Sequence, residues 1–134
     1  MVATVFAATP ELNLSWTGLV LRGYDPVAYF TVGEPVKGKR SLSVEHAGGT
    51  YRFSSEETQE LFLADPEKYL PAYGGYCAHG TAQNTKVGGD PRIWHIVDGR
   101  LYLNITRDVD RIWQQDIAGY IADADRNWPS IKYD

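Results

Sequence analysis

The first regular pattern along the chain is an alternation of polar and apolar residues over residues 41–53, interrupted near its middle by two adjacent glycines. Such alternation is typical of strands with one buried face, and a glycine pair between two of them favours a tight turn. We therefore expect a β-hairpin here. Every second side chain of a strand shares a face, which places Leu42, Val44 and His46 together.

A second hairpin is predicted farther along the chain. Apolar and polar residues alternate over residues 93–97 and again over residues 100–104, on either side of Asp98 and Gly99. Asp-Gly between two such runs is among the strongest short-range signals for a two-residue hairpin turn.

Helix starts are indicated at three places between the hairpins and before them. Asp25 precedes a proline, which suits an N-cap followed by the first helical position, so a short helical turn is expected. Ser54, with Glu57 three residues later, matches a capping box and predicts a helix over about residues 55–64. Asp65 repeats the Asp-Pro signal and predicts a second short helix.

Over residues 73–91 the periodic spacing of apolar residues stops and glycines become frequent, which predicts a long loop. Long loops in compact domains are usually functional or disordered. Apolar residues return at three- and four-residue spacing near the C-terminus, which predicts an amphipathic helix that Gly119 breaks into two pieces. The stripe consists of Val109, Ile112, Trp113, Ile117, Tyr120, Ile121 and Ala124.

These elements predict an α+β fold of small antiparallel hairpins packed with short helices and a C-terminal amphipathic helix. The chain has 134 residues, of which 43% are hydrophobic, which suits one globular domain. We place that domain at residues 20–130, with residues 1–19 as an N-terminal segment. The four tryptophans are expected in the core: Trp16, Trp94, Trp113 and Trp128.

Charge and hydropathy exclude some partners. The net charge is −4, and no clustered excess of Lys and Arg accompanies it, so a nucleic-acid partner is not expected. Residues 37–40 form a short basic run that we interpret as a solvated loop. No stretch of about 18 apolar residues exists to span a membrane.

The first eight residues are apolar and end in small side chains, as the tail of a secretory signal does. They suit a trimmed signal remnant, a disordered start or an edge strand equally well. A periplasmic or otherwise exported location is therefore expected, with the cytoplasm as the alternative.

Candidate chemistry centres on Cys77, the only cysteine, which lies in the glycine-rich loop with His79 two residues on. A thiolate is both a nucleophile and a soft metal ligand, and its availability depends on its pKa and exposure. His79 has the chemistry to share a metal with Cys77 or to stabilise its thiolate. His46 and His95 lie on predicted strands, where a structural role is the simpler interpretation.

Six separated motifs, taken in order, resemble the YHS domain family, and more narrowly its branch of small, often exported bacterial proteins in which selenocysteine can replace the cysteine. The likeness extends over about residues 20–130. The motifs are GYDPVAYF at residues 23–30, YRFSS at 51–55, LF at 61–62, PEKY at 66–69, YGGYCA at 73–78 and DGRLYLN at 98–104. The resemblance implies a treble-clef-like core and an association with metals such as copper.

The chain departs from the metal-binding branch at three positions. That branch has one cysteine soon after its Asp-Pro-Val and two more around the start of the helix. Here Ala28 stands at the first place, and Ser54 and Thr58 stand at the other two. The multi-thiolate site of that branch is therefore missing, and the resemblance leaves Cys77 as the reactive position.

The first functional hypothesis is a non-enzymatic module that binds a soft transition metal, copper or zinc, through Cys77 and His79, with His46 or His95 as a further ligand. The second is a thiol redox or peroxide-reactive protein in which Cys77 is the catalytic thiolate and an external thiol completes turnover. The third is a structural or interaction domain with an inert cysteine.

Overall fold

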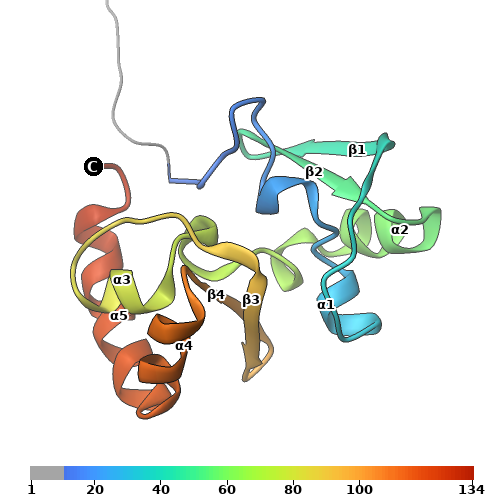
Figure 1. Cartoon of the computed structure of the whole chain (residues 1–134). Helices are drawn as coiled ribbons and strands as arrows, with labels where there is room; N and C mark the ends of the chain where they lie inside the picture. Colours follow the sequence, from blue (N-terminus) through green and yellow to red (C-terminus); the bar gives the residue numbers. More distant parts are fainter. Residues whose placement is uncertain (1–10) are drawn as a thin grey trace, which may run out of the picture.

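The chain folds around two separate antiparallel hairpins, shown in Figure 1 as a computed structural model that describes residues 11–134. Its strands are β1 (Lys39–His46), β2 (Gly49–Phe53), β3 (Asp90–Val97) and β4 (Arg100–Asn104). Its α-helices are α1 (Ala28–Thr31), α2 (Glu56–Ala64), α3 (Ala78–Ala82), α4 (Arg107–Gln114) and α5 (Ile117–Ile131). The 3-10 turns are η1 (Leu21–Gly23), η2 (Pro66–Lys68) and η3 (Ala72–Gly75).

The α+β class and both hairpins are thereby confirmed, whereas the treble-clef core and the domain boundaries stay predictions. The signal remnant or edge strand expected at residues 1–8 lies outside the described residues. The second short helix expected after Asp65 is the single 3-10 turn η2.

The first hairpin has the predicted faces. Strand β1 pairs with β2 from His46 opposite Gly49 to Lys39 opposite Phe53, with one irregularity in between. Leu42, Val44 and His46 are half-buried while their neighbours on β1 are exposed. Their shared face covers the core, as the alternation predicts.

Strand β4 is buried on both faces and divides the hydrophobic core. Leu101 and Leu103 belong to a first cluster, while Tyr102 points to a second. The first cluster also contains Val20, Leu21, Val27, Tyr29, Tyr51, Phe53, Phe62 and Tyr69. The second contains Ala72, Tyr73, Tyr76, Ala78, Ala82, Trp113 and Ala124. Figure 1 accordingly shows β3 and β4 between helices α3 to α5 and the half that carries β1, β2, α1 and α2.

Helix α2 begins one residue later than predicted, with Ser55 rather than Ser54 as its cap. The Ser55 hydroxyl accepts a hydrogen bond from the Thr58 amide at 3.1 Å, and the Thr58 side chain accepts one from the Ser55 amide. The prediction that Ser54 and Glu57 form this box is wrong. Ser54 is bound elsewhere, because its hydroxyl donates to Asp25 at 2.7 Å.

The long loop predicted over residues 73–91 is wrong in its first half, which contains part of η3 and all of α3. Its glycines allow other segments to pack closely against the backbone, rather than giving this segment conformational freedom. A Cβ on Gly74, whose φ is +62°, would lie 2.0 Å from the Glu11 carbonyl oxygen, and one on Gly89 would meet Leu103. Single-sequence periodicity misses such contacts because both partners are distant in sequence.

The C-terminal stripe forms two helices, as predicted, but the break does not lie at Gly119. Helix α4 ends at Gln114 and α5 begins at Ile117. The side chain of Asp116 accepts a hydrogen bond from the Gly119 amide at 3.1 Å and caps α5. Gly119 therefore lies in the first turn of the helix, where an unoccupied side-chain position leaves room for this carboxylate.

The tryptophans occupy different environments. Trp113 is fully buried, and Trp94 and Trp128 pack half-buried against the first and second clusters. Trp16 is 102% exposed, so its predicted place in the core is wrong. It lies on a tight turn closed by a hydrogen bond from the Gly18 amide to the Ser15 carbonyl, which directs the side chain outward.

Asp25 joins three segments from a fully buried position. Its Oδ1 accepts hydrogen bonds from the amides of Val27 (2.8 Å) and Ala28 (3.3 Å), which confirms its predicted capping role. Its Oδ2 accepts from the Ser54 amide (2.8 Å), the Ser54 hydroxyl (2.7 Å) and the Thr58 hydroxyl (2.7 Å). A buried carboxylate is tolerated when its oxygens are satisfied in this way.

We predict that Asp25→Ala lowers the free energy of unfolding by at least about 3 kcal/mol, because five donors lose their acceptor around a buried side chain. The matched control is Asp65→Ala, since Asp65 also precedes a proline but is exposed and makes no side-chain capping bond. We expect that control to change stability by about 0.5 kcal/mol or less. Urea denaturation followed by circular dichroism measures both, and equal losses would contradict the role assigned to Asp25.

Candidate functional site

Cys77 is held at the start of α3 and is nearly inaccessible to solvent. It is the N-cap residue, and its sulfur accepts a hydrogen bond from the Gly80 amide at 3.4 Å. The thiol donates to Oδ1 of Asn104 at 3.5 Å, and 1% of the residue is exposed. Its backbone is fixed by a bond from the Cys77 amide to the Val87 carbonyl and by a bridge to Leu103.

Burial raises the pKa of the Cys77 thiol above its ordinary value, because the thiolate loses its hydration. Hydrogen bonds from the backbone of Gly80, Ile105 and His79 act in the opposite direction, and the nearby charge of Asp110 adds to the rise. Desolvation is the largest of these effects. At neutral pH the side chain is therefore a protonated thiol.

The side-chain amide of Asn104 connects Cys77 to the Asp110 carboxylate, which in turn pairs with His95. Asn104 is fully buried, and its Oδ1 also accepts from the His79 backbone amide at 3.0 Å. Its Nδ2 donates to Asp110 at 2.8 Å, and Asp110 is 2.9 Å from Nε2 of His95. We call Cys77, Asn104, Asp110 and His95 the Cys77 network.

The two histidines nearest this network have aromatic neighbours. The ring of His79 lies 5.0 Å from that of Tyr120 on α5. The ring of His95 lies 5.3 Å from that of Trp113, and its Nε2 is paired with Asp110. His95 is thus oriented by a carboxylate, as metal-binding and catalytic histidines commonly are.

His46 lies in a different part of the molecule. Its ring packs against Phe62 and Tyr51 of the first cluster at 5.6 and 6.3 Å, and its Nε2 is 3.7 Å from Glu67. Among residues 11–134, no three side chains of His, Cys, Asp or Glu gather in a group that could hold a metal ion. The structure therefore joins Cys77 to His95 through the network and leaves His46 with the first cluster.

The three positions at which this chain departs from the metal-binding branch lie together around Asp25. The Ala28 amide, the Ser54 hydroxyl and the Thr58 hydroxyl all donate to its carboxylate. Where that branch has thiolates, this chain has a closed hydrogen-bonded cluster. Hydroxyls that already donate to a buried carboxylate are poor ligands for a soft metal.

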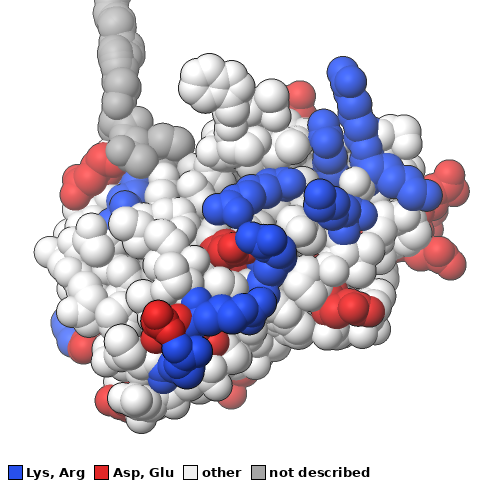
Figure 2. Space-filling model, in the orientation of Figure 1, with Lys and Arg blue, Asp and Glu red and all other residues white. Residues whose placement is uncertain are grey.

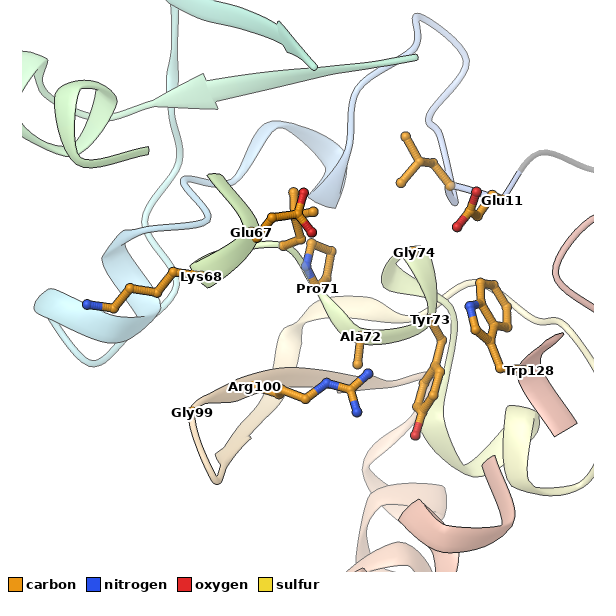
Figure 3. Close-up of a pocket in the computed structure, with 12 residues that line it drawn as sticks. Glu11, Glu67, Lys68, Pro71, Ala72, Tyr73, Gly74, Gly99, Arg100 and Trp128 are labelled. Atoms are coloured by element: carbon orange, nitrogen blue, oxygen red, sulfur yellow. The ribbon is translucent and has the colours of Figure 1, made fainter. Parts of the chain in front are cut away.

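A pocket of about 310 Å³ lies apart from the Cys77 network, between the η2–η3 segment, the β3–β4 turn and α5. Figure 3 shows Tyr73 and Trp128 on one side and Glu67 and Pro71 on the other. The ring centroids of Tyr73 and Trp128 are 5.8 Å apart.

Both acidic and basic side chains line the pocket. Arg100 extends its guanidinium toward Tyr73, 5.5 Å from the ring centroid, whereas Lys68 points away (Figure 3). Tyr73 has a φ of +55° and donates to Asp125 at 2.8 Å, and burial raises its pKa. A buried tyrosine in the left-handed backbone region and a half-exposed arginine therefore lie side by side in the wall of this pocket.

Asn104 and Asp110 are the network residues that sequence reasoning missed. Asn104 ends a buried strand, where a polar side chain between Leu103 and Ile105 is itself a signal. Asp110 resembles an ordinary charge in the first turn of α4. Its role depends on β3 and α4 packing together, which no local pattern encodes.

No helix in the described part of the chain is both long and apolar enough to cross a membrane. Comparison with family models matches residues 27–73 to the YHS domain, a family associated with metal binding. The matched segment contains Ser54, Thr58 and Tyr73 and ends before Cys77. Neither the curated proteins nor the solved structures gave a match. The chain is therefore similar to the YHS domain family over residues 27–73.

Proposed function

We propose that this protein is a non-enzymatic YHS module that binds a soft metal ion of the copper type, centred on Cys77. The observation that carries the proposal is that its one thiol begins the same short helix as His79 and is linked to His95 through Asn104 and Asp110. The metal association of the YHS family supports the same function.

The donor set favours copper over zinc. Structural zinc sites are tetrahedral and use four ligands, and the described residues offer no such group. Thiolate is a ligand that selects Cu(I), and imidazole also suits copper, so a cysteine with a histidine fits this metal. Cys77 and His79 would hold such an ion as a pair, since the described residues bring no third His, Cys, Asp or Glu side chain into one group with them. His95 is linked to Cys77 only through Asp110 and Asn104, and His46 is set apart with Glu67 and Phe62.

The surroundings of Cys77 determine how binding depends on pH. A metal ion takes the place of the thiol proton, and the pKa of this thiol is raised by burial. Affinity should therefore increase as pH rises toward that pKa. Asn104 would lose the thiol as a donor but keep the His79 amide.

A second candidate function is an interaction domain in which Cys77 is purely structural. The specific observation in its favour is burial, since the sulfur has both a donor and an acceptor and 1% of the residue is exposed. The same burial and raised pKa weigh against thiol redox chemistry, which needs an accessible thiolate. An exported, periplasmic location stays a prediction under either function.

The first test is metal retention. We expect the reduced full-length protein, loaded with Cu(I) and then dialysed, to retain close to one equivalent, and Cys77→Ser to retain almost none. His79→Gln should weaken retention by about tenfold or more because one soft ligand is lost. Elemental analysis after dialysis against a competing chelator gives the values.

His46→Gln is the matched control for these variants, because it removes an imidazole from the first cluster. We expect it to retain copper as the unsubstituted protein does. Loss of copper from this control, or equal retention by Cys77→Ser, would refute a site centred on Cys77. Absence of retained copper in the unsubstituted protein would favour the structural role instead.

The second test is thiol reactivity. We expect iodoacetamide to alkylate native Cys77 at neutral pH at least about tenfold more slowly than the same chain unfolded in guanidinium, because the thiol is buried and protonated. Mass spectrometry of quenched samples measures both rates. If native Cys77 is alkylated as fast as Cys77 of the unfolded chain, the result would instead support the redox function.

A further inference from the structure

Six cationic side chains gather on one face of the molecule, which we call the basic face. Figure 2 shows Lys and Arg side chains running across this view of the surface. The basic face consists of Arg22, Lys37, Lys39, Arg40, Arg52 and Arg92. Contacts join its parts, because Gly23 and Gly38 lie against Arg52, and Asp90 pairs with both Arg22 and Arg92. Lys37 lies just before β1, and the others come from η1, β1, β2 and β3.

Arg52 is the centre of this arrangement. Its side chain crosses the backbone at Gly23 and Gly38, where a Cβ would approach it at 3.5 and 2.6 Å. Gly23 follows Arg22, and Gly38 lies between Lys37 and Lys39, so the neighbouring cations are brought to Arg52 from both sides. The interpretation of residues 37–40 as a solvated loop is wrong, because Lys39 and Arg40 begin β1 and extend a larger surface.

The positive charge of the basic face is largely uncompensated. Among residues 11–134, the one carboxylate within 4.0 Å of any of its cations is Asp90, which Arg22 approaches at 3.9 Å and Arg92 at 2.9 Å. Nε of Arg52 is buried and donates to no described group. These cations are concentrated on one face although the chain as a whole has a net charge of −4. Such an asymmetry favours attraction of an anionic partner.

The fully exposed indole of Trp16 lies on a turn beside β2, the strand that carries Arg52. The Trp16 turn is bound to β2 by a hydrogen bond from the Thr50 amide to the Gly18 carbonyl at 3.0 Å. Thr50 and Arg52 are two residues apart on β2 and share its outer face. The turn that displays Trp16 is thus anchored beside the strand that carries the central arginine.

We propose that the basic face and Trp16 together bind an anionic lipid surface as a peripheral contact. Lys and Arg attract anionic headgroups, and tryptophan is favoured at the boundary between headgroups and acyl chains. The six cations are spread over four elements and the segment before β1 rather than gathered in a pocket, which suits an extended surface. An indole that projects fully into solvent beside such cations suits a bilayer interface, where tryptophan is enriched at headgroup depth.

The test is sedimentation of the full-length protein with vesicles. We expect binding to vesicles of equal parts phosphatidylglycerol and phosphatidylcholine, and little binding to phosphatidylcholine alone. Reversing Lys37 and Arg40 together to Glu should weaken binding by about tenfold or more, and added salt should weaken it further. Both side chains are exposed, so the fold should be retained.

The matched control reverses Lys68 and Arg126 to Glu, which changes the net charge equally on η2 and α5, outside the basic face. It should bind anionic vesicles within about twofold of the unsubstituted chain. Trp16→Ala should weaken binding and abolish a blue shift of the fluorescence on vesicle addition, since the other tryptophans are buried or half-buried. Equal losses in both charge variants, or binding of duplex DNA without binding of vesicles, would overturn the proposal.

Discussion

Strand β4 is the element on which the rest of the structure depends, because it is buried on both faces. Leu101 and Leu103 fill the first cluster and Tyr102 fills the second, so two small hairpins and several short helices become one folded unit. Neither two-stranded sheet is large enough to be stable by itself. Strand β4 belongs only to the second hairpin, but its alternate side chains pack into both clusters. It therefore stabilises the packing on both sides.

The Cys77 network is a consequence of the same strand. Asn104 ends β4 on the face of Tyr102, and its buried amide meets both Cys77 and Asp110. The strand thereby fixes where the thiol lies and which carboxylate faces His95. A buried thiol whose pKa is raised is a poor nucleophile, because a nucleophilic thiolate must be ionised and accessible.

Local sequence patterns correctly predicted the elements that are specified by neighbouring residues. Alternation and the Asp-Gly turn located both hairpins, and the Asp-Pro pattern identified Asp25 as a cap. The failures share one cause, which is competition from a distant partner. Ser54 does not cap α2 because Asp25 binds it, and the glycines near Cys77 pack tightly because residues 11–13 and β4 lie against them.

The sequence by itself determined the α+β class and both hairpins, since these follow from periodicity and turn chemistry, and its single thiol made Cys77 and His79 the candidate site. Only the tertiary structure decided that Cys77 is buried, that Asn104 and Asp110 connect it to His95, and that Trp16 is exposed. Burial and hydrogen-bond partners depend on which segments pack together. That packing is set by contacts between residues far apart in the chain, which no local pattern contains.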